Sequence, residues 1–395
     1  MEISTYNNFE NLCLMKEDWD KFMVSINSEI FLSYDWCKTW WKYYGNNNKL
    51  LIVVFRNNNQ ICGILPLHMD SISIGLIKFN IIKIVGTEYL PISVSIPIED
   101  ANIKEAIPLL FEILDGNFKW HILHLGAISG KYDKCSLDIC TRDLASRYTV
   151  RSKKHDIQTY FKIEESLDKY ISKLSPRQRT KTRRVYKELL EKNIILESVF
   201  SNKNNYIEHF ENFVKMHQNQ WNSIGKAGHF GAWPRSYDFH KEMIQTQINN
   251  GRLKLLEIML DNVCIGYEYM YEFGQYYLWY LSARTDNINN KIDFHRVAMG
   301  EKIIKAIGDN ITYIDGMRGK YEYKIVLGGE VQDISSVYIY RNDYITTVLV
   351  NIFRSIFWIF DNAYSKLWRS RIAPRLKCAH SPYKDSWIRS HLLSF

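Results

Sequence analysis

The sequence predicts a mixed α/β fold of the α+β kind, in which mainly antiparallel sheets are flanked by helices. Residues 253–281 alternate apolar and polar side chains and are broken by turn signals such as Asp261–Asn262, which is typical of a three-stranded meander. Asp293 is a good N-cap, apolar residues at helical spacing follow it, and Ile311–Ile314 predicts a further strand. Residues 50–125 repeat this order of strands, helix and strand, so we expect two sheet-and-helix units.

The chain is long and apolar enough for two separate cores. Its 395 residues are 46% hydrophobic, 24% charged and 14% aromatic, which is a globular rather than a disordered composition. The formal net charge is +8, and residues 341–395 supply nine Lys or Arg against three Asp, which is +6 of that total. We expect domains at residues 1–150 and 151–340, followed by a basic amphipathic helical tail at residues 341–395.

The N-terminal segment is expected to form two helices, three strands, a helix and a closing strand. In order these are helices Asp18–Ile26 and Phe31–Tyr44, strands Leu50–Phe55, Gln60–Met69 and Gly75–Val85, helix Ile103–Leu114 and strand His121–Leu125. Trp36, Trp40 and Trp41 share an apolar face of the second helix, which favours core packing over ligand contact. His121 and His124 point to opposite faces of their strand, and no metal-ligand spacing occurs elsewhere, so no metal site is predicted.

The middle of the chain contains a densely basic helix. The elements expected before the meander are the strand Thr149–Phe161 and the helices Pro176–Lys192, Tyr206–Trp221 and Tyr237–Asn249. In the first of these helices six Lys or Arg precede the first acid, Glu188, and the apolar stripe is thin. Two interpretations stay open: a solvated surface helix, or a wall for a phosphate-bearing ligand to which Arg179 and Arg183 would contribute.

A glycine-bearing loop is expected at Asn222–Trp233. It is too long for a simple turn between two helices, and loops of this kind are often binding sites or lids. His229 is a candidate general base because imidazole titrates near neutral pH, and Trp233 is a candidate substrate contact. The alternative for His229 is a loop histidine that faces water.

Several motifs carry a resemblance to a known family. The meander, helix and strand are followed by Asp315, Gly319, Tyr323 and Lys324, and upstream lie the segments Phe31–Gly45, Gly63–Leu67 and Leu174–Lys187. With these, the chain from about residue 28 to residue 330 resembles the BioF2-like or CelD-type acetyltransferases, GNAT proteins related to the FemAB aminoacyl transferases. The resemblance implies tandem GNAT-like domains. One departure is that Arg284–His295 lacks the glycine-rich loop that ordinary GNAT proteins carry before the helix that binds pyrophosphate.

The resemblance implies acyl transfer from acetyl-CoA, used as a co-substrate. The helix that begins near Asp293 would receive the diphosphate, because N-terminal N–H groups and the helix dipole favour phosphate. The candidate donor-binding residues are Tyr280, Arg284, Lys291, Asp293, Phe294, His295 and Arg296. Tyr323 and Lys324 match the family positions for stabilising the oxyanion, with Tyr280 a lesser choice. Candidates for the base are Asp315, Glu268 and His229, and Arg318 joins Arg179, Arg183 and Trp233 as a substrate-binding candidate.

Three functions follow from these residues and the resemblance. The first is transfer of an acetyl group to an amine or hydroxyl of a sugar or a cell-envelope polysaccharide precursor, which is a small-molecule, glycan or lipid-linked acceptor. The second is a FemAB-like transferase that uses aminoacyl-tRNA. The third is an inactive binding module that docks on an envelope-polysaccharide assembly complex through residues 344–395. None of these functions calls for DNA.

The sequence predicts a cytoplasmic protein. Its seven cysteines are scattered without a CxxC pair, and residues 1–20 contain no apolar signal-peptide core. Tyr344–Trp368 predicts a helix with one apolar face. That helix either packs on the catalytic domain or lies in a membrane interface, which would place the protein peripherally at the inner membrane face.

Overall fold

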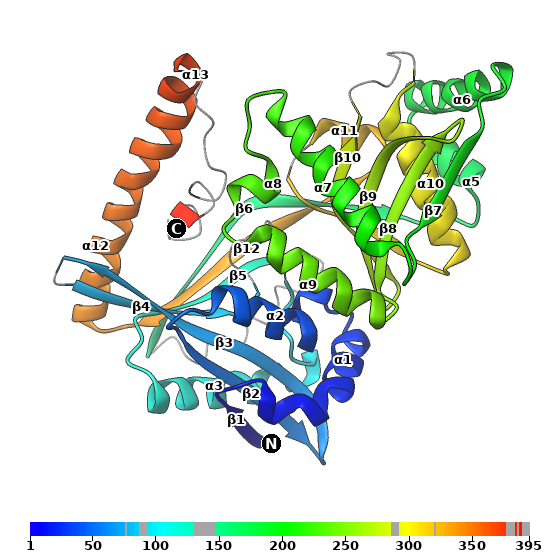
Figure 1. Ribbon diagram of the computed structural model, residues 1–395. Helices are drawn as coiled ribbons and strands as arrows, with labels where there is room; N and C mark the ends of the chain where they lie inside the picture. Colours follow the sequence, from blue (N-terminus) through cyan, green and yellow to red (C-terminus); the bar gives the residue numbers. More distant parts are fainter. Residues whose placement is uncertain are drawn as a thin grey trace. The chain divides into compact units, whose positions relative to one another are not determined.

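The computed structural model describes residues 1–75, 77–86, 94–129, 147–285, 292–319 and 321–376, together with residues 384, 387 and 388. The chain divides into two compact units, and the path passes from one to the other within strand β6 and returns within strand β12 (Figure 1). Unit 1 contains Met1–Asp156, Asp333–Leu376 and Pro382–Phe395, and unit 2 contains Ile157–Gln332 and Lys377–Ser381.

Unit 1 contains a mixed sheet with the strand order β1-β2-β3-β4-β5-β12. Its neighbouring strands pair antiparallel except β4 and β5, which run parallel. The strands are β1 (Glu2–Tyr6), β2 (Lys49–Asn57), β3 (Gln60–Ile74), β4 (Ile77–Ile84), β5 (Ile122–Ser129) and β12 (Glu330–Arg341). The helices are η1 (Glu10–Met15), α1 (Lys16–Ser25), η2 (Ile30–Leu32), α2 (Tyr34–Tyr44), η3 (Asp100–Asn102), α3 (Ile103–Asn117), α12 (Tyr344–Phe360), η4 (Asp361–Ile372) and α13 (Ala373–Arg375).

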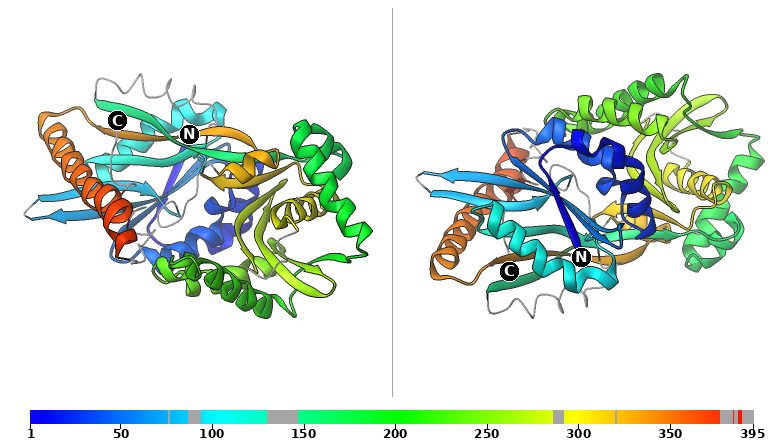
Figure 2. Two further views of the ribbon diagram at one scale, coloured as in Figure 1. Left: turned by 90° about the horizontal axis from the view of Figure 1, so that it is seen from above. Right: turned by 90° about the horizontal axis from the view of Figure 1, so that it is seen from below.

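Aromatic and aliphatic residues form the core of unit 1. Trp19, Trp36 and Trp40 are fully buried, which confirms the core role predicted for two of the three tryptophans of α2, while Trp41 is partly exposed. Helix α12 covers part of the sheet, where Phe353 stacks on Phe79 of β4 with ring centroids 4.1 Å apart. Figure 2 shows α12 and η4 as one continuous helical rod, coloured orange to red.

The strands of unit 2 have the order β6-β11-β10-β9-β8-β7 in the sheet. These strands are β6 (Tyr148–Lys162, which begins in unit 1), β7 (Leu196–Phe200), β8 (Leu253–Leu260), β9 (Val263–Phe273), β10 (Tyr276–Arg284) and β11 (Tyr313–Arg318). The helices of unit 2 are α5 (Leu167–Lys173), α6 (Pro176–Glu191), α7 (Tyr206–Asn222), α8 (Gly228–Ala232), α9 (Ser236–Asn249), α10 (Phe294–Gly308) and α11 (Glu322–Val326). The pair β10 and β11 is parallel, and the other pairs among these strands with a described register are antiparallel.

Helices cover both faces of the sheet in unit 2. Successive residues of a strand point to opposite faces, so Tyr269 and Met270 of β9 mark the two sides. Met270 lies in the apolar cluster with α5, α6 and α10. The Tyr269 ring lies against Phe210 and Phe213 of α7 and His240 of α9. The sheet therefore separates two layers of side chains, which decides which candidate residues can meet.

The predicted α/β class is confirmed, and most differences from the predicted elements lie at their ends. The meander strand predicted to stop at Leu281 continues to Arg284, and the strand predicted at Ile311–Ile314 begins at Tyr313. The prediction of an open loop at Asn222–Trp233 was wrong, because that segment contains the short helix α8.

Candidate functional site

Strands β10 and β11 lie side by side for only three residues and then part. Tyr276–Leu278 pairs with Tyr313–Asp315, and from there β10 continues beside β9 while β11 continues beside β6. The register of β10 against β9 shifts between Trp279 and Leu281, so Tyr280 is an extra residue at this point. A bulge of this kind bends its strand, and it accompanies the separation of β10 from β11.

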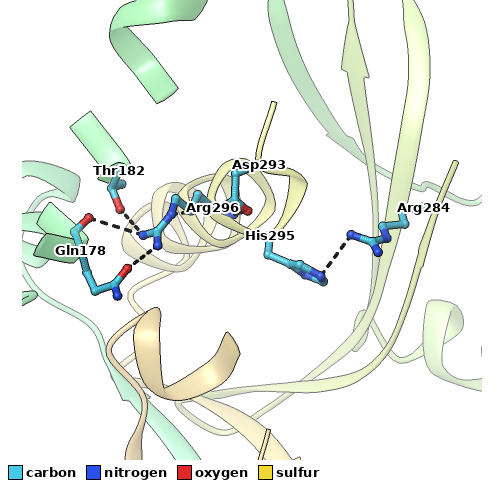
Figure 3. A network of polar contacts seen from close by, with 6 residues as sticks. All are labelled: Gln178, Thr182, Arg284, Asp293, His295 and Arg296. Atoms are coloured by element: carbon cyan, nitrogen blue, oxygen red, sulfur yellow. Dashed lines mark hydrogen bonds and ion pairs between the residues drawn. The ribbon is translucent and has the colours of Figure 1, made fainter. Parts of the chain in front are cut away.

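Helix α10 begins beside the parted strands with a filled cap. The Asp293 carboxylate accepts hydrogen bonds from the Arg296 backbone N–H at 3.4 Å and from its guanidinium Nε at 3.0 Å, as the predicted N-cap requires. The same guanidinium donates to Thr182 Oγ1 of α6 at 2.8 Å and to the Gln178 side chain (Figure 3). Arg296 is 5% exposed, so in this structure it joins α10 to α6 rather than facing a ligand.

The first turn of α10 presents other groups near the end of β10. The N–H groups of Phe294 and His295 find no acceptor among the described residues, while the Phe294 ring is buried in the core. His295 Nε2 lies 3.4 Å from the Arg284 guanidinium, which donates to it, as Figure 3 shows. Burial, and then the positive charge of Arg284, lower the pKa of His295 to about 4. His295 is therefore neutral at physiological pH, and Arg284 supplies the positive charge here.

Helix α11 brings the two family-matched residues to the same region. The Tyr323 ring stacks on His295 with centroids 4.8 Å apart and meets the Trp279 ring edge-on at 6.0 Å. Lys324 is 5% exposed, donates to the Gly316 carbonyl, and lies 5.9 Å from the centre of the Trp279 ring. Tyr323 and Lys324 therefore both face Trp279 of the parted strand.

A buried ion pair that the sequence did not predict lies beneath Trp279. Lys302 Nζ of α10 is 3.1 Å from Glu268 Oε2 of β9, and the two side chains are 1% and 0% exposed. Lys302 Nζ also lies 3.0 Å from the centre of the Trp279 ring, and Ser282 donates to Glu268 Oε2 at 2.7 Å. Burial lowers the pKa of Lys302 to about 8, although Glu268 acts to raise it. Glu268 Oε1 has no hydrogen-bond partner among the described residues, so this carboxylate keeps an unused acceptor.

Lys302 could not have been found from an amphipathic pattern. Over Phe294–Ile303 helix α10 is buried on every side, and Arg296, Glu301 and Lys302 are among its buried residues. A single apolar stripe predicts that the polar residues on the other side of a helix face water. That prediction fails for a helix that is buried on every side, where a lysine off the stripe is buried too.

A second group of candidates lies on the other face of the sheet. His229 of α8 is buried rather than facing water, and its Nε2 lies 3.1 Å from His240 Nε2. Tyr280 packs against both histidines, with ring centroids 6.0 and 5.2 Å away, and the Trp233 ring is 5.8 Å from His229. Because these rings share the Tyr269 side, the structure does not bring His229 or Tyr280 together with Glu268, whose side chain points to the opposite face.

The buried histidines are neutral. His217 Nδ1 donates to the Ser282 carbonyl at 3.0 Å, since its Nε2 accepts from the His229 backbone N–H at 3.4 Å. Burial lowers the pKa of His217 to about 4 and of His240 to about 3, and it lowers the pKa of His229 well below its usual value. No group of three His, Cys, Asp or Glu in the described part of the chain is arranged to hold a metal ion.

The remaining candidates are spread along β11 and α6. Asp315 is 5% exposed and accepts from the Met317 N–H at 2.8 Å and from the Gln158 side chain. Arg318 is half-buried at the end of β11, Arg179 donates to the Leu174 carbonyl at 3.3 Å, and Arg183 is exposed on α6. Lys291 lies outside the described residues.

Comparisons with known proteins agree with this geometry. Residues 176–325 match a family model described as "Acetyltransferase (GNAT) domain". No curated protein matches the chain. Among solved structures, FemX has 11% sequence identity and a TM-score of 0.60, with 85% of this chain and 97% of that chain covered.

Two further solved structures have lower scores. L-PGS from Bacillus licheniformis has 8% identity and a TM-score of 0.48, covering 85% of this chain and 95% of that one. A tandem GNAT protein from the clavulanic acid biosynthesis pathway has 10% identity and a TM-score of 0.43, covering 86% and 98%. The sequence match and the FemX likeness agree: residues 176–325 match a GNAT-type acetyltransferase domain, in a chain whose fold is similar to that of FemX.

Proposed function

We propose that the chain is a GNAT-type acyltransferase that moves an acetyl group from acetyl-CoA to an amine or hydroxyl of a sugar or a cell-envelope polysaccharide precursor. The observation that carries the proposal is the set of charged groups buried beside the parted strands: Glu268, Lys302 and Lys324. Burying ionised side chains is unfavourable unless they are paired, and buried charges next to a fold irregularity are typical of active sites. All three residues lie inside the segment, residues 176–325, that matches the acetyltransferase domain.

The donor would be held by its diphosphate at the start of α10. The first-turn N–H groups of Phe294 and His295 are available donors, and the helix dipole favours an anion there. Arg284 adds a cation at the end of β10, while Arg296 is committed to Asp293 and α6. We therefore assign Arg284 rather than Arg296 as the main phosphate contact, with Lys291 as a further candidate.

Lys324 and Tyr323 would stabilise the negative charge that develops on the thioester oxygen. A cation and a hydroxyl act strongly where water is excluded, and Lys324 is almost fully buried. Burial also raises the pKa of the Tyr323 hydroxyl, so that hydroxyl stays protonated and able to donate. Loss of one such donor typically reduces kcat by about 10²–10³.

Glu268 would accept the proton of the attacking amine or hydroxyl through a water molecule. Its Oε1 is the unused acceptor, and Lys302 and Ser282 hold its Oε2. Asp315 is the second choice, since its described hydrogen bonds already come from Met317 and Gln158. His229 is the third, because it lies on the opposite face of the sheet.

Calorimetric titration with acetyl-CoA tests the donor directly. We expect saturable binding to the full chain, about tenfold weaker for Arg284→Ala, which corresponds to about 1.4 kcal/mol. Lys215→Ala is the matched control, because Lys215 is an exposed cation on α7 of the same unit. Absence of binding to the unmodified chain, or equal weakening by both variants, would contradict the assignment.

The basic helix α6 favours one alternative, a FemAB-like transferase that uses aminoacyl-tRNA. Arg177, Lys181 and Arg184 are exposed and precede the first acid of the helix, Glu188. Phosphate contacts make nucleic-acid binding steeply dependent on salt. Filter binding with tRNA over a series of salt concentrations gives the slope of log affinity against log salt concentration. In the variant with all three residues changed to Gln, this slope should be smaller in magnitude by about two to three units.

The control for the tRNA experiment is a triple Gln variant of three exposed lysines of unit 1, Lys21, Lys104 and Lys119. It carries the same charge change and should leave the slope unchanged. Binding of tRNA by a chain that does not bind acetyl-CoA would replace the first proposal with the second, and no binding of tRNA at all would remove the second.

A further inference from the structure

Helix α12 and its continuation η4 have one side packed on unit 1. Val350, Phe353 and Phe357 are buried against Phe79 and Tyr338 of the sheet. Trp387 of the C-terminal segment packs against the same Phe357, with ring centroids 5.4 Å apart. This contact fixes the orientation of the helix on unit 1 and therefore which side of it faces outward.

The outward side carries a long row of exposed apolar side chains. Ile345, Ile352 and Ile359 recur every seven residues, which places them on one side of the helix, and they are 70%, 37% and 56% exposed. Val348, one turn after Ile345, extends the row, and Trp358 and Phe360 are 59% and 43% exposed on its two flanks. Single exposed apolar residues are ordinary, but a contiguous row marks a surface that contacts another apolar phase.

Basic residues follow the apolar row along the same rod. Exposed Lys366, Arg371 and Arg375 and partly exposed Arg369 lie in η4 and α13. The only acid between Tyr344 and Arg375 is Asp361, which Lys366 approaches at 3.7 Å. An apolar row, a tryptophan at its edge and a cluster of cations complement a bilayer surface with anionic headgroups. A second copy of the helix would bury the apolar row, but it would offer the basic cluster a single acid, Asp361, against four Lys or Arg.

The helix is suited to lie on a membrane rather than to cross it. Tyr344–Arg375 is long and apolar enough to span a bilayer by length and composition, with 22% of its most apolar window buried in the protein. Crossing would require Phe353 and Phe357 to leave their contacts in unit 1, and it would place Arg354 and Asp361 within the apolar layer. Lying at the interface keeps the packed side intact and the charges in water.

We propose that α12 and η4 dock unit 1 on the surface of a membrane that contains anionic lipids. Ile345, Ile352 and Ile359 enter the acyl-chain boundary, and Arg369, Arg371 and Arg375 contact lipid phosphates. This proposal stands apart from the acyl-transfer reaction, because it depends only on residues of unit 1.

Co-sedimentation with vesicles tests the docking. The full chain should sediment with vesicles of phosphatidylcholine and phosphatidylglycerol and lose affinity as salt rises. The triple variant Ile345→Glu, Ile352→Glu, Ile359→Glu should bind at least about tenfold more weakly. The triple variant Arg369→Gln, Arg371→Gln, Arg375→Gln should lose only the part of the binding affinity that depends on phosphatidylglycerol. Its binding to vesicles of phosphatidylcholine alone should be unchanged.

Matched controls separate the surface from general effects of charge. The triple variant Leu14→Glu, Ile195→Glu, Val263→Glu introduces the same charges at apolar sites that are 95%, 59% and 62% exposed elsewhere, and it should bind as the full chain does. Equal loss in this control, or no sedimentation of the full chain with either lipid, would overturn the proposal. Sedimentation velocity supplies a second readout. A concentration-dependent dimer that only the isoleucine variant abolishes would assign the surface to a second copy instead.

Discussion

The two units of this protein contain the same sequence of elements but bury different side chains. In unit 1 the strands β2, β3 and β4 lead through α3 to β5, which pairs parallel with β4. In unit 2 the strands β8, β9 and β10 lead through α10 to β11, which pairs parallel with β10. The buried residues of α3 are all apolar, whereas α10 also buries Arg296, Glu301 and Lys302.

This difference supports placing the proposed acyl transfer in unit 2. A fold needs only apolar packing between helix and sheet, as α3 demonstrates, so the buried charges of α10 are not required by the architecture. The described part of unit 1 also buries charged side chains, namely Asp20, Glu29, Asp35 and Lys83. The ion pairs given for Asp35 and Lys83 each include a partner that water can reach, since Lys16 is 36% exposed and Asp70 is 19% exposed. In unit 2 both members of the Glu268–Lys302 pair are enclosed. We therefore propose that the acyl transfer takes place in unit 2.

The largest expected effect comes from breaking the enclosed pair. Lys302→Met leaves the Glu268 carboxylate buried without its cation and should reduce the free energy of unfolding by about 3–5 kcal/mol. Lys83→Met in unit 1 should cost only about 1–3 kcal/mol, because water can reach Asp70. Hydrogen exchange measured by mass spectrometry, resolved to peptides of each unit, gives the two values separately.

A double variant provides the check on this first prediction. Combining Lys302→Met with Glu268→Gln removes both charges, and most of the lost stability should return. If the double variant is as unstable as Lys302→Met alone, the loss is one of packing under Trp279 rather than of an unpaired charge.

Acid should destabilise unit 2 through its buried histidines. The pKa values of His217 and His240 are about 4 and about 3 in the fold, against about 6.5 in the unfolded chain. The stability that these two groups contribute is therefore complete above about pH 6.5, and it falls as the pH drops to about 4 for His217 and about 3 for His240, because the unfolded chain takes up protons first. Near pH 5.5 each of these two groups should have cost about 1.4 kcal/mol.

Peptide-resolved hydrogen exchange at two pH values measures this second effect. Amides of α7, α8 and α9 should lose protection on acidification more than those of α1 and α2. His240→Gln should flatten the pH dependence by removing one titrating group while keeping a polar side chain. An unchanged slope in that variant would show that other groups control acid unfolding.

The sequence was informative wherever local patterns decide the outcome. The meander of β8, β9 and β10, the cap at Asp293 and the basic character of α6 all follow from spacing or turn chemistry, and the structure contains each of them. Tyr323 and Lys324 were identified by resemblance, and they do lie together beside Trp279. What α10 does with its enclosed charges depends instead on long-range packing.

Residues that meet only through tertiary structure were missed, or were named as alternatives that the sequence could not place relative to one another. Lys302 and Ser282 join Glu268 across three elements, and no short spacing relates them. His229 and Glu268 were alternative candidates for the base, and the structure places them on opposite faces of the sheet, His229 beside His240 and Glu268 beside Lys302. The bulge at Tyr280 also decides which face of the sheet the Tyr280 side chain takes. One extra residue reverses the alternation of side chains between the two faces along β10, and no sequence pattern indicates that extra residue.

Replacing a glycine by alanine in the two equivalent helices should change the free energy of unfolding in opposite directions. A Cβ on Gly300 of α10 would lie 1.6 Å from the Tyr186 hydroxyl oxygen of α6, so Gly300→Ala should cost about 1–3 kcal/mol. A Cβ on Gly116 of α3 meets nothing within 4 Å, and Gly116→Ala should stabilise unit 1 by about 0.5–1 kcal/mol. Thermal unfolding of both variants gives the signs.

A second substitution locates the cause of the Gly300 effect. Tyr186→Phe removes the hydroxyl, which has no hydrogen-bond partner among the described residues. It should therefore relieve part of the cost of Gly300→Ala. No relief would mean that the α6–α10 contact is limited by the aromatic ring or the backbone.

The smallest difference in stability between the two units is expected when the N-cap residue of α10 or of α3 is replaced. Asp293 caps α10 through the Arg296 N–H and also holds the Arg296 guanidinium, whereas Asn102 at the start of α3 makes no side-chain cap bond. Asp293→Ala should therefore cost about 0.5–2 kcal/mol. Asn102→Ala removes no cap bond and only the hydrogen bond that its Nδ2 donates to Glu99 Oε2 at 2.8 Å, so it should cost less, about 0.5 kcal/mol. Asp293→Asn keeps an acceptor for the N–H and should restore about half of the loss if the cap dominates. If it restores nothing, the ion pair with Arg296 matters more, and α10 is anchored to α6 mainly through charge rather than through its cap.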